Sequence, residues 1–383
     1  MFETKLDTMV REKVERIVNA MLDAEADEIA NAARYERTGE RKAYRAGHYE
    51  RKLTAKAGRL ALKVPKLKGA VFESAVIERY RRREQSVEES LIDMYLAGVS
   101  TRQVDDISQL LWGDRMPSQT LSDKLKKVYE DIDSWRTRPL ESEYPYVFMD
   151  GVWRKRSWGG HVENVSVLVA IGVDSEGHRE VIGVAEGMKE DGDSWEQFVR
   201  GMIERDLKGV RLVVGDRCAG LVSTVNSMLP KARYQRCMVH FMRNVLSRTP
   251  PTHRQWASAA LKAIFAMESR ESALAKAESV AAEMEARRLK AAANCLREGV
   301  GETTTYLLPE FPDGHRRRIR TNNMIERLNR EIRRRTRVVG SFPNGNSALM
   351  LVCARIRYVT DNEWSTRRYL DMSRLDDTLQ AAN

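Results

Sequence analysis

Residues 146–151 read Tyr-Val-Phe-Met-Asp-Gly, and residues 212–216 read Leu-Val-Val-Gly-Asp. Each stretch is a short apolar run that leads into an aspartate with a glycine beside it. Short apolar runs bounded by turn residues are typical of strands buried in a sheet. Both stretches therefore predict a strand of an α/β domain with a carboxylate held at its end.

The segments around these two strands alternate between strand and helix patterns. In chain order we expect strands over 161–173 and 180–187, a helix over 194–207, the strand of 211–214, a helix over 221–229 and a strand through 234. The order β-β-β-α-β-α-β predicts an α/β fold with a mixed sheet. Further helices are expected across 240–300, from about 321 to 335, and over 347–359.

The first 136 residues have a different character. Residues 1–33 show helical spacing of apolar residues, which indicates packing or a dimer contact. Residues 34–83 show a basic, glycine-interrupted pattern of short strands, including one over 60–65 that is expected to end at its proline. Residues 86–136 predict three helices, the second capped by Ser100 and ending near Gly113. Short helices with tight turns fit either a helix-turn-helix unit or an ordinary helical subdomain.

Positive charge is concentrated in two windows. The chain carries a net charge of +10, with 42% hydrophobic and 31% charged residues. Residues 34–83 contain 16 Lys or Arg against 5 Asp or Glu, and residues 316–337 contain 10 Arg against 2 Glu. One such window is usually a solvated face, but two in one chain favour a polyanion, namely nucleic acid, held at two places.

Several classes of protein are disfavoured by the sequence. No stretch is long and apolar enough to span a membrane, and the charged first residues do not form a secretory signal. The four cysteines, Cys218, Cys237, Cys295 and Cys353, lie far apart. This spacing argues against a disulfide scaffold and leads us to expect a cytoplasmic protein.

Asp150 and Asp216 each follow an apolar run, so each is expected at an edge of the sheet, where ligands bind in α/β proteins. If their strands are neighbours, the two carboxylates converge and repel each other unless they share a proton or bind a cation. Mg²⁺ or Mn²⁺ would suit such oxygen ligands. Alternatively, each aspartate caps the helix that follows it.

Glu326 is the third candidate acid. In a helix, Ile325, Leu328 and Ile332 would share a buried face, whereas Glu326 and Arg330 would lie on another. Glu326 is either a simple ion-pair partner of Arg330 or a metal ligand among phosphate-binding arginines. The number of arginines nearby favours the second interpretation.

Cys237 and His240 form a Cys-x-x-His pair that could be half of a zinc site. The sequence has no second pair with suitable spacing. We therefore expect both residues to pack and form hydrogen bonds beside the site.

These motifs together resemble the mutator family of bacterial insertion-sequence transposases, a branch of the DDE transposases. The resemblance extends from about residue 34 to residue 358, and it is carried by the segments 45–51, 98–102, 149–151, 213–221, 235–240 and, most specifically, 320–343. The sequence departs from the family in having Arg316 after His315, where a tryptophan is frequent, and in the Arg217-Cys218 pair.

The resemblance implies a ribonuclease H-like mixed-sheet catalytic core with an all-helical insertion, preceded by a helical and basic DNA-binding region. It implies that Asp150, Asp216 and Glu326 are catalytic and bind two Mg²⁺ or Mn²⁺ ions for in-line phosphodiester displacement. Cys237 and His240 would be structural residues near the site. The residues expected to contact DNA are Arg45, Arg51, Lys52, Arg102, Arg320, Asn323, Arg330, Arg333 and Arg337.

The expected organisation has five segments. Residues 1–85 form a helix and a basic DNA-binding segment, 86–140 a helix-turn-helix-like domain, 141–240 the first part of the core, 241–315 the helical insertion, and 316–383 the last part of the core. The expected partners are double-stranded DNA, as terminal inverted repeats and as target, and a second copy of the chain.

The expected function is the metal-dependent strand cleavage and strand transfer of transposition, a form of DNA recombination. Two alternatives are a catalytically inactive DNA-binding repressor derived from a transposase, and a nuclease that only cuts.

Overall fold

The computed structural model describes residues 5–78, 81–97, 99–158, 161–187, 192–336, 345–361 and 363–375. The chain forms two compact units, residues 1–128 and 129–383, and each is described by itself. The boundary falls inside helix α4 (Ser118–Arg136). Within the described ranges no helix is long and apolar enough to cross a membrane. The four cysteines all lie in these ranges, and none forms a disulfide.

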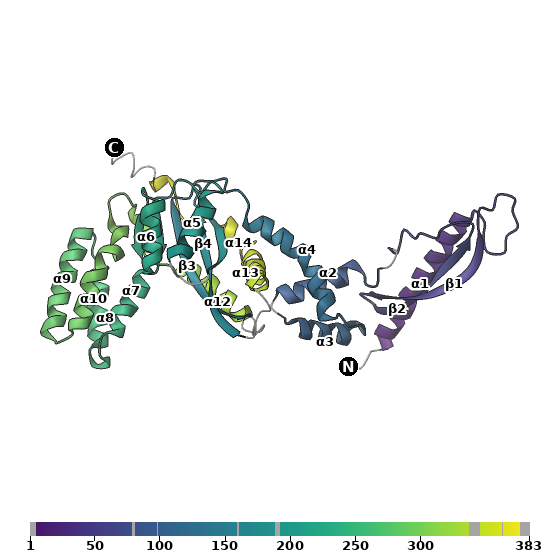
Figure 1. The fold of residues 1–383 in the computed structure, drawn as a ribbon, viewed down its shortest axis with the longest axis horizontal. Helices are drawn as coiled ribbons and strands as arrows, with labels where there is room; N and C mark the ends of the chain where they lie inside the picture. Colours follow the sequence, from purple (N-terminus) through teal and green to yellow (C-terminus); the bar gives the residue numbers. More distant parts are fainter. Residues whose placement is uncertain are drawn as a thin grey trace. The chain divides into compact units, whose positions relative to one another are not determined.

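A five-stranded mixed sheet forms the centre of the second unit (Figure 1). Its strands are β3 (Tyr146–Trp158), β4 (His161–Val173), β5 (Arg179–Gly187), β6 (Leu212–Gly215) and β7 (Arg233–Arg236). The strand order is β5-β4-β3-β6-β7, in which β5, β4 and β3 pair antiparallel and β3, β6 and β7 pair parallel. The predicted mixed sheet and element order are confirmed.

The side chains of β3 alternate between the two faces of the sheet, as the period of a strand requires. Val147 and Met149 join the core under α5 (Gly192–Ile203) and α6 (Ala219–Met228), together with the buried Trp195. Tyr146 faces the other way, with its ring centroid 6.2 Å from that of Phe311. Both faces of the central strands are therefore buried, which explains their continuous apolar sequence.

Helix α11 (Asp313–Ile319) is fixed to this second face through His315. Its Nε2 lies 2.8 Å from the backbone oxygen of Asp371, and its Nδ1 lies 2.8 Å from the hydroxyl of Tyr146. A carbonyl can only accept, so Nε2 carries the proton and Nδ1 accepts from Tyr146. Burial lowers the pKa of His315, which is consistent with a neutral ring.

A group of helices between β7 and α11 confirms the helical segment expected over 240–300 (Figure 1). It comprises α7 (Met238–Ser247), η1 (Pro251–His253), α8 (Arg254–Ile264), α9 (Arg270–Ala286), α10 (Lys290–Thr303) and η2 (Thr305–Leu307). The buried Gln235 of β7 joins the far end of this group to the sheet. It donates to the backbone oxygen of Thr303 (2.8 Å) and accepts from the backbone nitrogen of Tyr306 (2.8 Å).

The chain then continues through α12 (Asn323–Thr336), α13 (Gly345–Thr360) and α14 (Glu363–Thr366). Of these, α12 and α13 match the two helices expected at the end of the chain. Ile325, Leu328 and Ile332 are buried, as their spacing predicts.

The first unit combines α1 (Lys5–Ala30) with a long antiparallel hairpin of β1 (Tyr44–Ala55) and β2 (Gly58–Lys68). Leu22 of α1 packs against Leu60 and Leu62 of β2. The prediction of a strand ending at Pro65 is wrong, because β2 continues to Lys68. Pro65 pairs with His48 at a shift in register, and a bulge is one place where a residue without an N–H is tolerated in a strand.

Three helices follow the hairpin: α2 (Gln85–Leu96), α3 (Thr101–Trp112) and α4. Ser100 caps α3 and forms a capping box with Gln103, and Gly113 ends the helix with a left-handed φ of 68°. Arg83 and Asp114, whose side chains approach to 2.8 Å, connect the segment before α2 with the segment after α3. The three helices and their caps agree with the sequence prediction.

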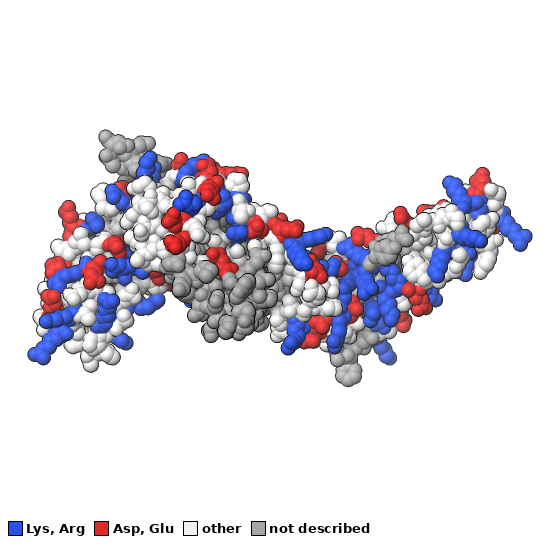
Figure 2. Space-filling view, viewed as in Figure 1, with Lys and Arg blue, Asp and Glu red and all other residues white. Residues whose placement is uncertain are grey.

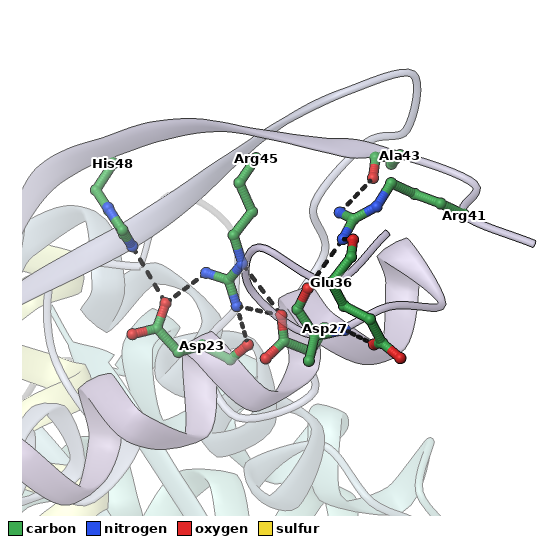
Figure 3. A network of polar contacts seen from close by, with 8 residues as sticks. Asp23, Asp27, Glu36, Arg41, Ala43, Arg45 and His48 are labelled. Atoms are coloured by element: carbon green, nitrogen blue, oxygen red, sulfur yellow. Dashed lines mark hydrogen bonds and ion pairs between the residues drawn. The ribbon is translucent and has the colours of Figure 1, made fainter. Parts of the chain in front are cut away.

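Arg45 holds the hairpin against α1 (Figure 3). Its guanidinium lies 2.7 Å from a carboxylate oxygen of Asp23 and 2.7 Å from one of Asp27, and it also donates to the backbone oxygen of Asp23 (2.6 Å). His48 Nε2 lies 3.1 Å from the same Asp23 carboxylate. The Arg45 side chain is only 12% exposed, so its donors serve the packing of this unit.

We expect Arg45→Ala to loosen the hairpin from α1, because two carboxylates lose their shared partner. Hydrogen bonds to charged groups typically contribute about 1.5–3 kcal/mol. Amide hydrogen exchange over residues 44–68 of the full chain should become faster. Arg59→Ala, which changes an exposed arginine of the same hairpin, is the matched control, and equal exchange in both variants would contradict this role.

The pH dependence of the same contact has a defined sign. Burial alone would raise the pKa of Asp23, but hydrogen bonds and charge from His48 and Arg45 outweigh it and lower the pKa below 3.8. A lowered folded-state pKa contributes stability above the unfolded-state pKa, and this contribution is lost as the pH falls through the folded-state value. Protection of residues 44–68 should therefore persist down to about pH 4 and decline below it.

Candidate active site

The parallel pairing of β3 with β6 brings the segments that carry Asp150 and Asp216 together. Phe148 of β3 pairs with Val214 of β6, and each aspartate comes two residues after its member of this pair. Asp216 follows the last residue of β6. Asp150, however, lies inside β3 and not after it, because β3 continues as a hairpin with β4 beyond the end of β6.

The alternative that the two aspartates cap helices is wrong. Asp150 is followed by more of β3 and by no helix. Helix α6, which comes after Asp216, has Cys218 as its N-cap residue and no side-chain cap. The Asp216 side chain is instead 42% exposed and open to a ligand.

Helix α12 brings Glu326 to the same edge. The side chain of the fully buried Asn322, just before α12, donates to the backbone oxygen of Met149 (2.9 Å), next to Asp150. The backbone nitrogen of Met238 donates to the backbone oxygen of Arg320 (3.0 Å), which joins the start of α12 to the start of α7. These contacts hold the beginning of α12 against Met149 of β3 and against the start of α7, which follows β7.

His240 connects two of the acids. Its Nδ1 is hydrogen-bonded to Asp216, and its Nε2 lies 2.8 Å from Glu326 Oε1. The hydrogen bond with Asp216, followed by that with Cys237, raises the pKa of His240 to about 10, although burial opposes the shift. The imidazole is therefore charged at neutral pH and compensates the two carboxylates. In the described chain no contact joins Glu326 to Arg330, so the simple ion pair is not formed.

Asn329 connects α12 to the remaining acid. This residue is 1% exposed and lies one helical turn after Glu326. Its side-chain nitrogen donates to Asp150 Oδ2 (2.7 Å), and the backbone nitrogen of Gly151 donates to Asp150 Oδ1 (3.0 Å). Both oxygens of Asp150 are thereby oriented by fixed donors.

Cys237 and His240 lie beside the site, as we expected from the sequence, whereas the sequence indicated no role for Asn329. Two features of the sequence could have indicated the contacts of His240 and Asn329 with the acids. A Cys-x-x-His pair directly follows β7, the neighbour of β6. An asparagine also stands three residues after Glu326, on the face that turns towards the sheet.

The donor set fits a divalent cation with a preference for oxygen. Asp150, Asp216 and Glu326 supply carboxylate oxygens from three separate elements, which is the ligand type that Mg²⁺ and Mn²⁺ prefer. Asp216, Cys237 and His240 also lie close enough to share an ion. The sulfur of the buried Cys237, however, accepts from the backbone nitrogen of Asn322 (3.3 Å), and both ring nitrogens of His240 already face carboxylates.

Comparison with known proteins shows the family of this chain. The family model described as "Transposase, Mutator family" matches residues 2–366. This chain belongs to the Mutator family of transposases. The resemblance inferred from the motifs is thereby confirmed over nearly the whole sequence.

Individual relatives cover almost the full chain. The transposase for insertion sequence element ISRM5 of Rhizobium meliloti is 35% identical over 366 residues, which cover 96% of this chain and 91% of the relative. The transposase for IS1081 of Mycobacterium tuberculosis is 34% identical, with 95% and 88% covered. The transposase for IS256 in transposon Tn4001 of Staphylococcus aureus is 32% identical, with 94% and 92% covered.

The predicted DNA contacts of this Mutator-family chain differ in their surroundings. Lys52, Arg102, Asn323, Arg330 and Arg333 are exposed. The other predicted contact residues are hydrogen-bonded within the protein, partly buried or outside the described residues. Arg45 is engaged with aspartates, Arg51 donates to the backbone oxygens of Glu78 and Arg81, Arg320 is partly buried, and Arg337 lies outside the described residues.

We expect Asn329→Leu to lower the affinity for Mn²⁺ by about 10- to 100-fold, because Asp150 loses the donor that orients it. Isothermal titration of the full chain with Mn²⁺ measures this. Asn323→Ala, which changes an exposed residue at the start of the same helix, should bind as the wild type does. Unchanged affinity in Asn329→Leu would show that Asp150 needs no such support.

Proposed function

We propose that this chain cleaves DNA at the ends of an insertion sequence and transfers the strands to new DNA, with Asp150, Asp216 and Glu326 as ligands of two divalent ions. The observation that supports this proposal is a chain of contacts that links the three acids. His240 contacts both Asp216 and Glu326, and Asn329, one helical turn after Glu326, donates to Asp150. The strand order β5-β4-β3-β6-β7 supports our further proposal that the core is ribonuclease H-like.

In this proposal, neighbouring residues of the chain hold the three acids in position. Asn329 and the backbone of Gly151 orient Asp150. His240 holds Asp216 and Glu326 at a fixed separation and reduces their repulsion. When bound, the divalent ions would supply activation of the attacking hydroxyl and stabilisation of the leaving oxygen.

The first unit offers a surface suited to the ends of the element. A groove of about 1070 Å³ lies between the hairpin and the segments around α2 to α4. Exposed Lys52, Arg59, Arg82 and Arg115 line it, and Figure 2 shows Lys and Arg gathered over this part of the unit. Contacts with phosphates supply much of the affinity of DNA-binding proteins, so we propose that residues 34–136 bind the terminal inverted repeats.

A homodimer is part of the proposal, because two element ends must be brought together. Helix α1 carries exposed apolar side chains that support it, namely Leu6, Met9, Val10, Ile17 and Met21. This surface agrees with the packing or dimer contact expected from the spacing in α1.

Replacing any of the three acids by alanine should abolish cleavage and joining of labelled element ends in Mg²⁺. Binding of the ends should be nearly unchanged, because the acids are proposed to take part in the reaction and not in DNA binding. Glu196→Ala, which removes an exposed acid from α5, is the matched control. Wild-type joining by any one of the three variants would remove that residue from the site. Binding without cleavage by the wild type would favour a catalytically inactive DNA-binding repressor.

Lys52→Gln combined with Arg59→Gln should weaken end binding and reduce the slope of log K against log salt by about 2, one for each phosphate that the variant no longer neutralises. Binding measured by fluorescence anisotropy at several salt concentrations tests this. Lys126→Gln, which changes an exposed lysine of α4 outside the groove, should keep the wild-type slope. An unchanged slope in the double variant would exclude the groove as a contact surface.

A further inference from the structure

A second basic hollow lies within the unit of residues 129–383. It has a volume of about 430 Å³ and is lined by Arg179, Arg318, Arg327, Arg367 and Arg368 with Trp364 and Tyr369. We call it the arginine pocket. Its residues come from β5, α11, α12, α14 and the segment that follows α14.

The positive charge of the arginine pocket is largely uncompensated. Within the described ranges, Arg179, Arg318, Arg327 and Arg367 have no carboxylate partner, and only Arg368 approaches one, Asp371, at 3.5 Å. Burial lowers the pKa of Arg179. Tyr369 opposes this shift, and the charges of Arg318, Arg327 and Arg367 add to it. Guanidiniums that repel one another in this way favour binding of an anion.

Arginines with a purely structural role look different in this protein. Arg297 lies 2.7 Å from Glu278 and 2.7 Å from Glu285. Arg138 similarly pairs with Glu180 at 2.6 Å. The absence of such partners around the four described arginines of the pocket distinguishes it from these ion-pair networks.

The pocket is also held in shape. The guanidinium of Arg179 donates to the backbone oxygen of Trp364 (2.7 Å) and lies 4.5 Å from the centre of the Trp364 ring. Arg318 lies 4.4 Å from the centre of the Tyr369 ring. Stacking of this kind fixes the plane of a guanidinium and leaves its edge free for a bidentate contact.

The segment that carries the two aromatic rings is itself anchored. The backbone nitrogens of Tyr369 and Leu370 donate to the backbone oxygen of Gly177 (2.7 and 3.2 Å), in the turn before β5. Gly177 has a φ of 90°, and a Cβ there would lie 1.9 Å from the backbone oxygen of Leu370. Only glycine permits this close approach.

The place of the pocket indicates which anion it would meet. Arg327 directly follows Glu326 in α12, so their Cα atoms are about 3.8 Å apart. Arg318, Arg327 and Arg367 are exposed, so a long polymer can reach them. Successive side chains of a helix point in different directions, so Glu326 and Arg327 lie at the same level of α12 but face different parts of its surroundings. A DNA backbone that passes the acids can meet the pocket on the neighbouring face of α12.

We propose that the arginine pocket binds backbone phosphates of the DNA, next to the phosphodiester that meets Asp150, Asp216 and Glu326. This inference rests on the proposed function, in which DNA is the substrate. It adds a second contact surface, on the catalytic unit, which joins Arg318 and Arg327 of the basic window 316–337 to Arg179, Arg367 and Arg368, which lie outside that window. Contacts of this kind would position the strand without reading its sequence.

The test compares the double variant Arg318→Gln/Arg367→Gln with the double control Arg288→Gln/Arg248→Gln, in which two exposed arginines outside the pocket and outside both basic windows are changed. Both lose the same net charge. Binding to an element-end duplex extended by flanking DNA is measured without divalent ions at several salt concentrations. The pocket variant should bind severalfold more weakly, with a salt slope lower by about 2, and the control should match the wild type.

A series of duplexes with one neutral methylphosphonate linkage then locates the contact. One linkage near the cleavage position should weaken wild-type binding and leave the pocket variant unaffected. Arg327→Gln, which disrupts none of the ring contacts described above, should show the same loss of sensitivity. Equal salt slopes and equal methylphosphonate profiles in pocket variant and control would overturn the proposal.

An experiment with inorganic phosphate distinguishes a pocket that binds DNA phosphates from a pocket that binds free phosphate. If it raises the Tm of the wild type but not of the pocket variant, while both bind DNA equally, the pocket takes free phosphate and the DNA assignment is wrong. A wild type without salt-dependent DNA binding would contradict both this inference and the proposed function. Normal wild-type binding with no pocket effect would contradict this inference alone.

Discussion

The parallel pairing of β3 with β6 is the constraint on which the candidate active site depends. The register places Phe148 beside Val214, and Asp150 and Asp216 each follow two residues later. Two nearby carboxylates repel each other, and the cost grows as water is excluded. Here the repulsion is offset by the amide of Asn329 on one acid and by the charged ring of His240 on the other. In the proposed function, divalent ions add to this compensation.

The third acid depends on the docking of a helix. Asn322 attaches the beginning of α12 to the backbone of Met149, and the backbone oxygen of Arg320 attaches it to α7. A carboxylate on a packed helix is positioned more accurately than one on a loop. The helical group between β7 and α11 does not disturb this position, because Gln235 fixes the far end of that group, near Thr303 and Tyr306, to β7.

Basic residues serve two purposes in this chain, and the presence of an acidic partner separates them. Arg45 and Arg83 are paired with aspartates and hold the first unit together. Exposed Lys52 and Arg59 in the groove, and Arg318 and Arg367 in the arginine pocket, offer their charge to a ligand. A net charge of +10 alone does not make this distinction, since a guanidinium already bound to carboxylates has few donors left for a phosphate.

The sequence by itself determined the local structure and the family. Apolar runs predicted β3 and β6, Ser100 as a cap predicted the start of α3, and the motif around Glu326 indicated the Mutator family. Local patterns suffice for these features, because strand and helix periods and caps involve residues within a few positions of one another.

Only the tertiary structure decided which side chains meet. Asn329 contacts Asp150, 179 positions away, and Arg45 of β1 contacts Asp23 of α1, 22 positions away. The arginine pocket draws on residues from 179 to 369. No periodicity records such pairs, because they arise from strand register and helix docking. For the same reason the continuation of β2 past Pro65 could not be predicted, since it depends on the bulge in the facing strand.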